Sequence, residues 1–233
     1  MKAALELIEE AEPFSFTLRE AAKRAGVAVS APYRHFENKA ALMTAIAEEG
    51  AQRMNAMMIE EMELAGDSPE AKFQAMGIAF VKFAVSHPGY FRVLHAPENV
   101  RVDVSPGLQQ AFAENTAMVT SLFQQMQSEG VLEDGNPMLQ FLSAQSMTYG
   151  LARMFVDGQM ARFGLESSDA VLVAKAVTGV LGMGLAPRKE QADAGDSNGL
   201  TDDEESKLTS MFAVMMQHGE RALEDSEDSV SNG

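Results

Sequence analysis

Apolar residues recur every three or four positions along most of the chain, which is the spacing of amphipathic helices. The first predicted helix carries Leu5 and Ile8. By the same spacing, further helices are predicted over residues 18–25, 39–64, 73–84, 108–129, 137–160 and 168–185. The strict alternation of apolar and polar residues that marks a half-buried strand is absent from the sequence. The pattern therefore predicts an all-α fold.

The end of the chain has a different pattern. The stretch PRKEQADAGDSNGLTDD is polar, rich in Asp and Gly and without periodicity, which is typical of a mobile linker. Apolar residues then return at helical spacing from Leu208 to Met216, ahead of the acidic ending EDSEDSVSNG. We expect a linker over 187–203, and a C-terminal amphipathic helix with an acidic tail over 204–233.

Composition limits the possible classes of function. The 233 residues are 46% hydrophobic and include no cysteine, so the chain can bury a large core but has no disulfide or thiolate metal site. No apolar run approaches the roughly 18 residues that a membrane span needs, and we expect a soluble, cytoplasmic protein without a membrane partner. The sequence also lacks a recognisable Ser-His-Asp arrangement, phosphate-binding glycine loop or HExxH motif. We expect no enzyme, no catalytic residue, no cofactor and no metal.

Charge is distributed unevenly along the chain. The formal net charge is −16, yet the window from Thr17 to Ala40 holds five basic residues against two acidic ones, a local charge of +3. A basic region on an acidic body can bind a polyanion locally while the rest of the protein repels it. A solvated helix face of mixed charge explains the same window, so charge alone does not decide between the two.

The spacing of polar and special residues in this window indicates a helix-turn-helix. Thr17 is placed to cap a helix that closes at Gly26, where a left-handed residue is needed. Ser30 is placed to cap a second short helix, with Pro32 in its first turn, where a missing N–H costs nothing. In a helix-turn-helix, the second helix lies in the major groove of DNA.

The stretch FTLREAAKRAGVAVSAPYRHFENKAALMTAIAEEG, Phe16 to Gly50, resembles the DNA-binding domain of the TetR family of transcriptional regulators. The shared features are the Thr-Leu-Arg-Glu opening, the Ala-Gly-Val turn, the Tyr-x-His-Phe core and a lysine three residues after the Phe. The resemblance implies a helix-turn-helix DNA-binding domain over 1–45, followed over 46–186 by a helical ligand-binding and dimerisation domain.

By position, the resemblance implies that Tyr33, His35 and Lys39 reach DNA phosphates, with Thr17 doing so from the start of the second helix. Arg34 would contact either a phosphate or a base. Hydroxyl and imidazole groups are common phosphate partners, which fits these positions. Ordinary solvated charge, and for His35 packing beside its neighbour, are the alternative roles. The residues implied to face base edges are Val29, Ser30 and Ala31.

The body of the chain carries a second resemblance. The segment FVKFAVSHPGYFRVLHAPE is similar to a group of TetR proteins whose C-terminal domain carries a Trp and a His-Gly further along. This chain keeps Gly150 but has Gln145 and Tyr149 where that group has the Trp and the His.

A TetR-like body implies an effector, and the chain offers many Met and aromatic residues to line an apolar site. Arg92 and Arg153, if they point inward, favour an anionic head group on the effector. Core packing is the alternative role for each of these side chains. The candidate lining residues are Phe80, Phe83, Tyr90, Phe91, Leu94, Met118, Phe123, Met147, Tyr149 and Phe155.

Together these features predict a ligand-responsive DNA-binding regulator, most simply a dimeric repressor that a small, largely apolar effector releases from its operator. One short recognition helix gives little specificity, so a homodimer would bind two half-sites of double-stranded DNA, with helices 137–160 and 168–185 at its interface. The alternatives are a helical small-molecule carrier and a protein-interaction module without specific DNA binding.

Overall fold

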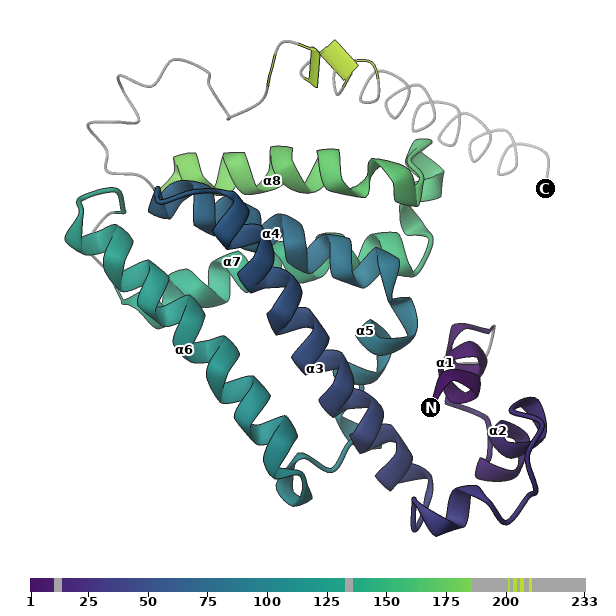
Figure 1. The fold of residues 1–233 in the computed structure, drawn as a ribbon. Coiled ribbons are helices and arrows are strands. Elements are labelled where there is room, and N and C mark those ends of the chain that lie inside the picture. Colours follow the sequence, from purple (N-terminus) through teal and green to yellow (C-terminus); the bar gives the residue numbers. More distant parts are fainter. Residues whose placement is uncertain are drawn as a thin grey trace, which may run out of the picture. The chain divides into compact units, whose positions relative to one another are not determined.

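The computed structural model describes residues 1–10, 14–132 and 136–185, together with Thr201, Asp203, Glu204, Ser206, Lys207 and Ser210. Every regular element within these ranges is helical, as predicted (Figure 1). The α-helices are α1 (Lys2–Glu9), α2 (Leu18–Arg24), α3 (Lys39–Leu64), α4 (Pro69–Ser86), α5 (Pro88–Leu94), α6 (Pro106–Ser128), α7 (Pro137–Val156) and α8 (Ala170–Leu185). The short 3-10 helices are η1 (Pro32–Arg34), η2 (Pro97–Asn99), η3 (Val102–Val104), η4 (Gln159–Phe163) and η5 (Ser167–Asp169).

One predicted helix is too long. The helix expected over 137–160 ends at Val156, because Gly158 takes the left-handed conformation with φ of 70° and redirects the chain into η4. Glycine adopts this conformation at little cost, so it commonly follows the end of a helix.

The predicted linker over 187–203 and the helix and tail over 204–233 lie mostly outside the described residues. At the described positions, the backbone N–H of Thr201 donates to a Glu204 carboxylate oxygen at 2.8 Å, and the Glu204 N–H donates back to the Thr201 hydroxyl at 3.3 Å. Glu204 also pairs with Lys175 of α8, Nζ to Oε2, at 2.7 Å. These hydrogen bonds lower the pKa of Glu204 to about 2, and the bond from Lys175 has the largest effect.

The chain divides into two compact units. The first unit comprises Met1–Glu60 and Ser86–Val119, and the second comprises Glu61–Val85 and Thr120–Gly233. The largest fully buried side chains of the first unit are Ile8, Met43, Ile46, Phe91, Val93 and Leu108, and those of the second are Val81, Phe83 and Phe123.

In the first unit, α1 and α5 cap each other. Glu9, the last residue of α1, accepts a hydrogen bond from the Gly89 N–H at the start of α5, at 3.1 Å. In return, Arg92 of α5 donates to the carbonyl of Ile8 at the end of α1, at 3.1 Å. Each charged group stands at the helix end whose dipole it complements. The contact fixes α5 against α1.

Within the first unit, polar contacts also join α3 to α6 and to Ser105, the residue that directly precedes α6. The Ser105 hydroxyl donates to Glu48 at 2.7 Å and accepts the Leu108 N–H, so it caps the start of α6. Two turns further along α3, buried Asn55 donates to the carbonyl of Ala111 at 2.8 Å. These bonds fix the register of α6 on α3.

In the second unit, α7 and α8 lie side by side (Figure 1). Helix α4 meets both through small residues. A Cβ on Gly77 of α4 would lie 2.6 Å from the methyl group of Thr178 on α8 and 3.5 Å from that of Thr148 on α7. Both buried threonines turn their hydroxyls to carbonyls of their own helices, so their methyl groups face α4. The absence of a side chain at Gly77 therefore sets this close packing.

Within the described residues, no helix has both the length and the apolar character needed to cross a membrane. In the same part of the chain, no three His, Asp or Glu side chains gather as a metal site would require.

Candidate nucleic-acid interface

Helix α2 begins and ends as the sequence predicts. The Thr17 hydroxyl accepts the Glu20 N–H at 3.2 Å, while the Glu20 carboxylate accepts the Thr17 N–H at 2.6 Å. This arrangement is a capping box. Its hydrogen bonds hold the pKa of Glu20 below its ordinary value, and the bond from the Thr17 backbone has the largest effect. At the other end, Gly26 has φ of 67°, and the Val27 N–H bonds to the Ala22 carbonyl at 3.1 Å. The turn is a Schellman motif.

The second helix of the motif is a single 3-10 turn, η1, rather than an α-helix. Pro32 is its first residue, as predicted, but the cap position falls on Ala31 and no side chain caps the turn. The prediction that Ser30 caps this helix is wrong, because Ser30 precedes the cap position by one residue. Its hydroxyl stays on the exposed surface instead.

The residues around η1 form an exposed surface with an unusual share of large apolar groups. Val27, Val29 and Tyr33 are 48%, 51% and 51% exposed. Arg34 and His35 are exposed beside them, and the His35 ring lies 6.4 Å from the Phe36 ring, centroid to centroid. Because apolar side chains this exposed need a reason, the surface is a candidate for contact with a partner. We call residues Val27–His35 the recognition surface.

Small residues hold the recognition surface on the core of the first unit. Ala21 and Ala22 of α2 are buried, and Leu42 of α3 is 3% exposed. These three line, with Phe36 and Pro32, an apolar hollow of about 350 Å³ that also borders the start of α1. The alanines allow α2 to come close to η1 while leaving this hollow unfilled.

Two predicted DNA contacts are already bonded within the chain. The Thr17 hydroxyl belongs to the capping box with Glu20. The Lys39 ammonium donates to the Phe14 carbonyl and lies 4.7 Å from the centre of the Phe16 ring. Val29, Ser30, Tyr33, Arg34 and His35 are exposed, and Ala31 is half-buried. The structure therefore brings six of the eight candidates together on the recognition surface.

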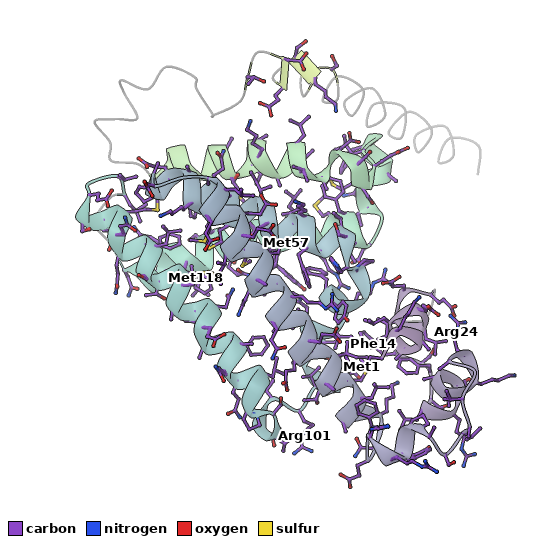
Figure 2. All side chains as sticks on the ribbon, in the orientation of Figure 1. Met1, Phe14, Arg24, Met57, Arg101 and Met118 are labelled. Atoms are coloured by element: carbon purple, nitrogen blue, oxygen red, sulfur yellow. The ribbon has the colours of Figure 1, made fainter. Side chains whose placement is uncertain are left out.

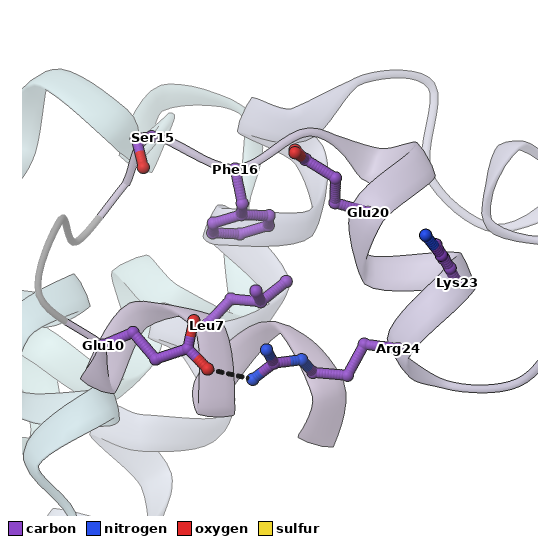
Figure 3. Close-up of a pocket in the computed structure, with 7 residues that line it drawn as sticks. All are labelled: Leu7, Glu10, Ser15, Phe16, Glu20, Lys23 and Arg24. Atoms are coloured by element: carbon purple, nitrogen blue, oxygen red, sulfur yellow. Dashed lines mark hydrogen bonds and ion pairs between the residues drawn. The ribbon is translucent and has the colours of Figure 1, made fainter.

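A second hollow of about 670 Å³ opens between α1 and α2 (Figure 3). Its charged lining residues are Glu10, Glu20, Lys23 and Arg24. Arg24 pairs with Glu10, and Glu20 is bonded to Thr17. Because three of its four charges already bond within the chain, we assign no ligand to this hollow.

The candidate effector residues fall into both units. Tyr90, Phe91 and Leu94 of α5, and Met118 of α6 (Figure 2), belong to the first unit. The first two of these are buried, and both Tyr90 and Leu94 lie against Gly50 of α3. The candidates in the second unit are Phe80, Phe83, Phe123, Met147, Tyr149 and Phe155.

Burial separates the candidates of the second unit. Phe80, Phe83 and Phe155 are buried, and so is Phe123, whose ring meets the Phe73 ring edge-on at 5.4 Å between centroids. Met147 is 39% exposed. Both hollows described above lie in the first unit, away from these residues in the sequence.

The two arginines considered for an anionic effector have other partners. Arg92 donates to the Ile8 carbonyl, and Arg153 pairs at 2.6 Å with Asp157, the residue that follows the end of α7. The sequence around Arg92 does not indicate its partner, because Ile8 lies 84 residues earlier. By contrast, the role of Glu20 in capping α2 can be inferred from the sequence, because a Glu three residues after a capping Thr has the spacing of a capping box.

Two family models match the chain. One, described as bacterial regulatory proteins of the tetR family, matches residues 1–46, and the other, described as a tetracyclin repressor-like C-terminal domain, matches residues 73–180. A comparison with curated protein sequences found no match.

Solved structures share the fold. A protein of unknown function from Rhodococcus sp. RHA1 is 24% identical, with a TM-score of 0.65 over 80% of this chain and 93% of that chain. The ketosteroid transcriptional regulator KstR2 of Mycobacterium tuberculosis is 18% identical, with a TM-score of 0.63 over 80% and 93%. The fatty acid degradation regulator FadR from Bacillus halodurans is 17% identical, with a TM-score of 0.61 over 79% and 96%.

The helix-turn-helix geometry and the family matches agree over most of the described chain. The first match covers α1, α2, η1 and the start of α3, and the second covers α5, α6 and α7 and most of α4 and α8. This chain therefore belongs to the TetR family of ligand-responsive, DNA-binding transcriptional regulators.

Proposed function

We propose that this protein is a dimeric repressor that binds a double-stranded operator through its recognition surface and leaves it when a small, largely apolar effector binds. The observation that carries the proposal is the exposed surface Val27–His35, presented by a capped α2 and a left-handed glycine turn. In the proposed division of the chain, residues 1–45 bind DNA and 46–186 bind the effector and the second subunit. No catalytic activity is proposed, and operator binding places the protein in the cytoplasm.

The chemistry of the surface divides its roles. The Tyr33 hydroxyl, the His35 ring and the Arg34 guanidinium suit phosphate oxygens, which position a protein on DNA without reading its sequence. Val29, Ser30 and Ala31 directly precede η1 and suit base edges, where Val and Ala methyl groups can meet the methyl group of thymine. The acidic remainder of the chain repels DNA and so restricts contact to this surface.

An apolar effector fits the side chains available in the body. The candidates are mostly phenylalanine and methionine, and a Met side chain adapts its shape to a ligand. The neighbours named as ketosteroid and fatty acid degradation regulators share the fold and fit the same chemistry. The arginines at 92 and 153 are paired within the chain, so an anionic head group is no longer part of the proposal.

The proposed mechanism is a shift between two populations of the dimer. Helix α3 starts five residues after η1 and runs to Leu64, so one continuous helix connects the sequence of the first unit to that of the second. An effector that favours one position of α3 changes the separation of the two recognition surfaces. DNA half-sites lie about 34 Å apart, so a changed separation weakens binding to both at once.

The first test uses a duplex that the wild-type protein selects from a random-sequence library, with binding followed by fluorescence anisotropy. Tyr33→Phe removes only a hydroxyl, and we expect it to weaken binding to selected and scrambled duplexes alike, by about two- to tenfold, the scale of one hydrogen bond. Arg162→Gln on η4, outside the recognition surface, should leave both affinities unchanged. If no sequence is selected and Tyr33→Phe has no effect, the carrier alternative replaces the repressor.

A further inference from the structure

Lys39, the first residue of α3, points back toward the chain that precedes α2. Its ammonium group donates a hydrogen bond to the carbonyl of Phe14 and lies 4.7 Å from the centre of the Phe16 ring. The side chain is half-buried, whereas Tyr33, Arg34 and His35 of the recognition surface are exposed. Contacts within the chain therefore hold the Lys39 ammonium, unlike that of a lysine whose side chain extends into solvent.

The acceptor of this hydrogen bond has a strained backbone. Phe14 has φ of 69°, and in the described residues it is the one non-glycine residue with a positive φ. Such a conformation is costly for a residue with a Cβ and persists where neighbouring contacts enforce it. The Lys39 ammonium is a contact of this kind, because it bonds the carbonyl of the strained residue itself (Figure 2 labels Phe14).

The same lysine also fixes the start of α2. Phe16, whose ring it covers, is 6% exposed and directly precedes the capping residue Thr17. Glu20, the other half of the capping box, attracts Lys39 electrostatically. Burial lowers the pKa of Lys39, and this attraction opposes the effect. Lys39 thus joins the first turn of α3 to the cap of α2 through Phe14, Phe16 and Glu20.

We propose that Lys39 is a positioning residue for DNA recognition, which holds the segment Phe14–Phe16 and thereby the start of α2 on α3, instead of binding phosphate itself. This inference rests on the proposed function, since it concerns how the recognition surface is aimed. The Phe14 carbonyl takes one of the three donors of the ammonium, and together with the Phe16 ring it sets where the ammonium lies. Without these contacts, the segment that leads into the capped end of α2 would lose this attachment to α3.

A phosphate contact and a positioning residue predict different losses of DNA affinity when the residue is substituted. A phosphate contact contributes equally on every sequence, and its removal lowers the slope of log affinity against log salt concentration by about 0.9. A positioning residue changes the fit to the selected sequence and leaves the number of released counterions unchanged. Lys39→Met keeps the apolar stem over Phe16 and removes the charge and the donor. Arg34→Gln removes an exposed cation of the recognition surface and serves as the comparison.

For Lys39→Met, we expect affinity for the selected duplex to fall by about tenfold or more, the scale of a lost charged hydrogen bond. Affinity for the scrambled duplex and both salt slopes should stay at wild-type values. Arg34→Gln should lower the salt slope on both duplexes. The proposal is overturned if Lys39→Met lowers both affinities equally and reduces the slope as Arg34→Gln does.

A double-mutant cycle tests the route of the effect. Phe16→Leu removes the ring and leaves Lys39 in place, so by itself it should reduce discrimination between the two duplexes. Combined with Lys39→Met, it should add little, because both changes break one assembly. Additive losses would contradict the proposal. Phe16→Leu also provides the test if Lys39→Met does not fold, as judged by circular dichroism.

Hydrogen exchange without DNA gives an independent readout. In Lys39→Met, the amides of Thr17 and Glu20 should exchange faster than in the wild type, while those of α4 should not change. Unchanged exchange at the α2 cap overturns the positioning role even if the protein selects no DNA sequence. Failure to select DNA with faster exchange at the cap would instead refute the repressor and keep the structural role of Lys39.

Discussion

Gly77 is a residue at which α4 lies close to α8, with space for a hydrogen atom but not for a methyl group. Gly77→Ala should lower the free energy of unfolding by about 1 kcal/mol, because overpacking outweighs the gain in helix propensity. Gly150→Ala on α7 is the matched control, since a Cβ there meets nothing within 4 Å. It should raise the unfolding free energy by about 0.5–1 kcal/mol. Urea denaturation measures both, and two shifts of the same sign would contradict this account.

Single residues also show where the sequence was informative. Thr17 and Gly26 were predicted correctly, because a cap and a left-handed turn are set by neighbours within a few positions. Ser30 was predicted wrongly by one position, since residue type alone does not say which residue begins a single turn. The partner of Lys39 lies 25 residues away, and no local pattern reports it.

At the scale of elements, the α1–α5 contact joins the first helix of the chain to the HPGYFR segment. Arg92→Met should remove the donor from the end of α1 and lower the unfolding free energy by about 1–3 kcal/mol, the scale of a charged hydrogen bond. In this variant, the amides of α1 should exchange hydrogen faster than in the wild type, and their rates should rise more than those of α3. Arg162→Met on η4 is the control and should change neither value. Normal protection of α1 in Arg92→Met would show that the cap adds nothing.

The short length of α5 explains why its role could not be predicted from the sequence. Pro88 and Gly89 mark its beginning, and its seven residues are too few to show which partner they pack against. Glu9 and Arg92 are ordinary charged residues in the sequence. Only when α1 and α5 meet does each become the cap of the other.

At the scale of the whole molecule, the proposed dimer calls for an apolar face on the last helices. Val171 and Val180 of α8 are 43% and 56% exposed, and Leu139 and Leu142 of α7 are 63% and 48% exposed. Val180→Glu would bury an unpaired carboxylate in the contact, which costs several kcal/mol. We therefore expect the dimer dissociation constant to rise by about a hundredfold or more.

Light scattering after size-exclusion chromatography measures this change. Leu64→Glu on α3 is the control, because Leu64 is 76% exposed and lies outside α7 and α8. It should leave the dimer intact. Val180→Glu should also lose binding to a duplex with two half-sites more than to one with a single half-site, since two-fold symmetry is what links the half-sites. An unchanged mass for Val180→Glu would place the dimer contact elsewhere.

The sequence by itself determined the helical fold, the capped α2, its glycine turn and the family, because each depends on residues close together in the chain. Periodicity and caps act over one or two turns, so a single sequence carries them completely. The tertiary structure alone decided that η1 is one turn, that Arg92 caps α1 and that Lys39 bonds Phe14. The last two are contacts between distant residues, and which donor meets which carbonyl is fixed only when the helices pack.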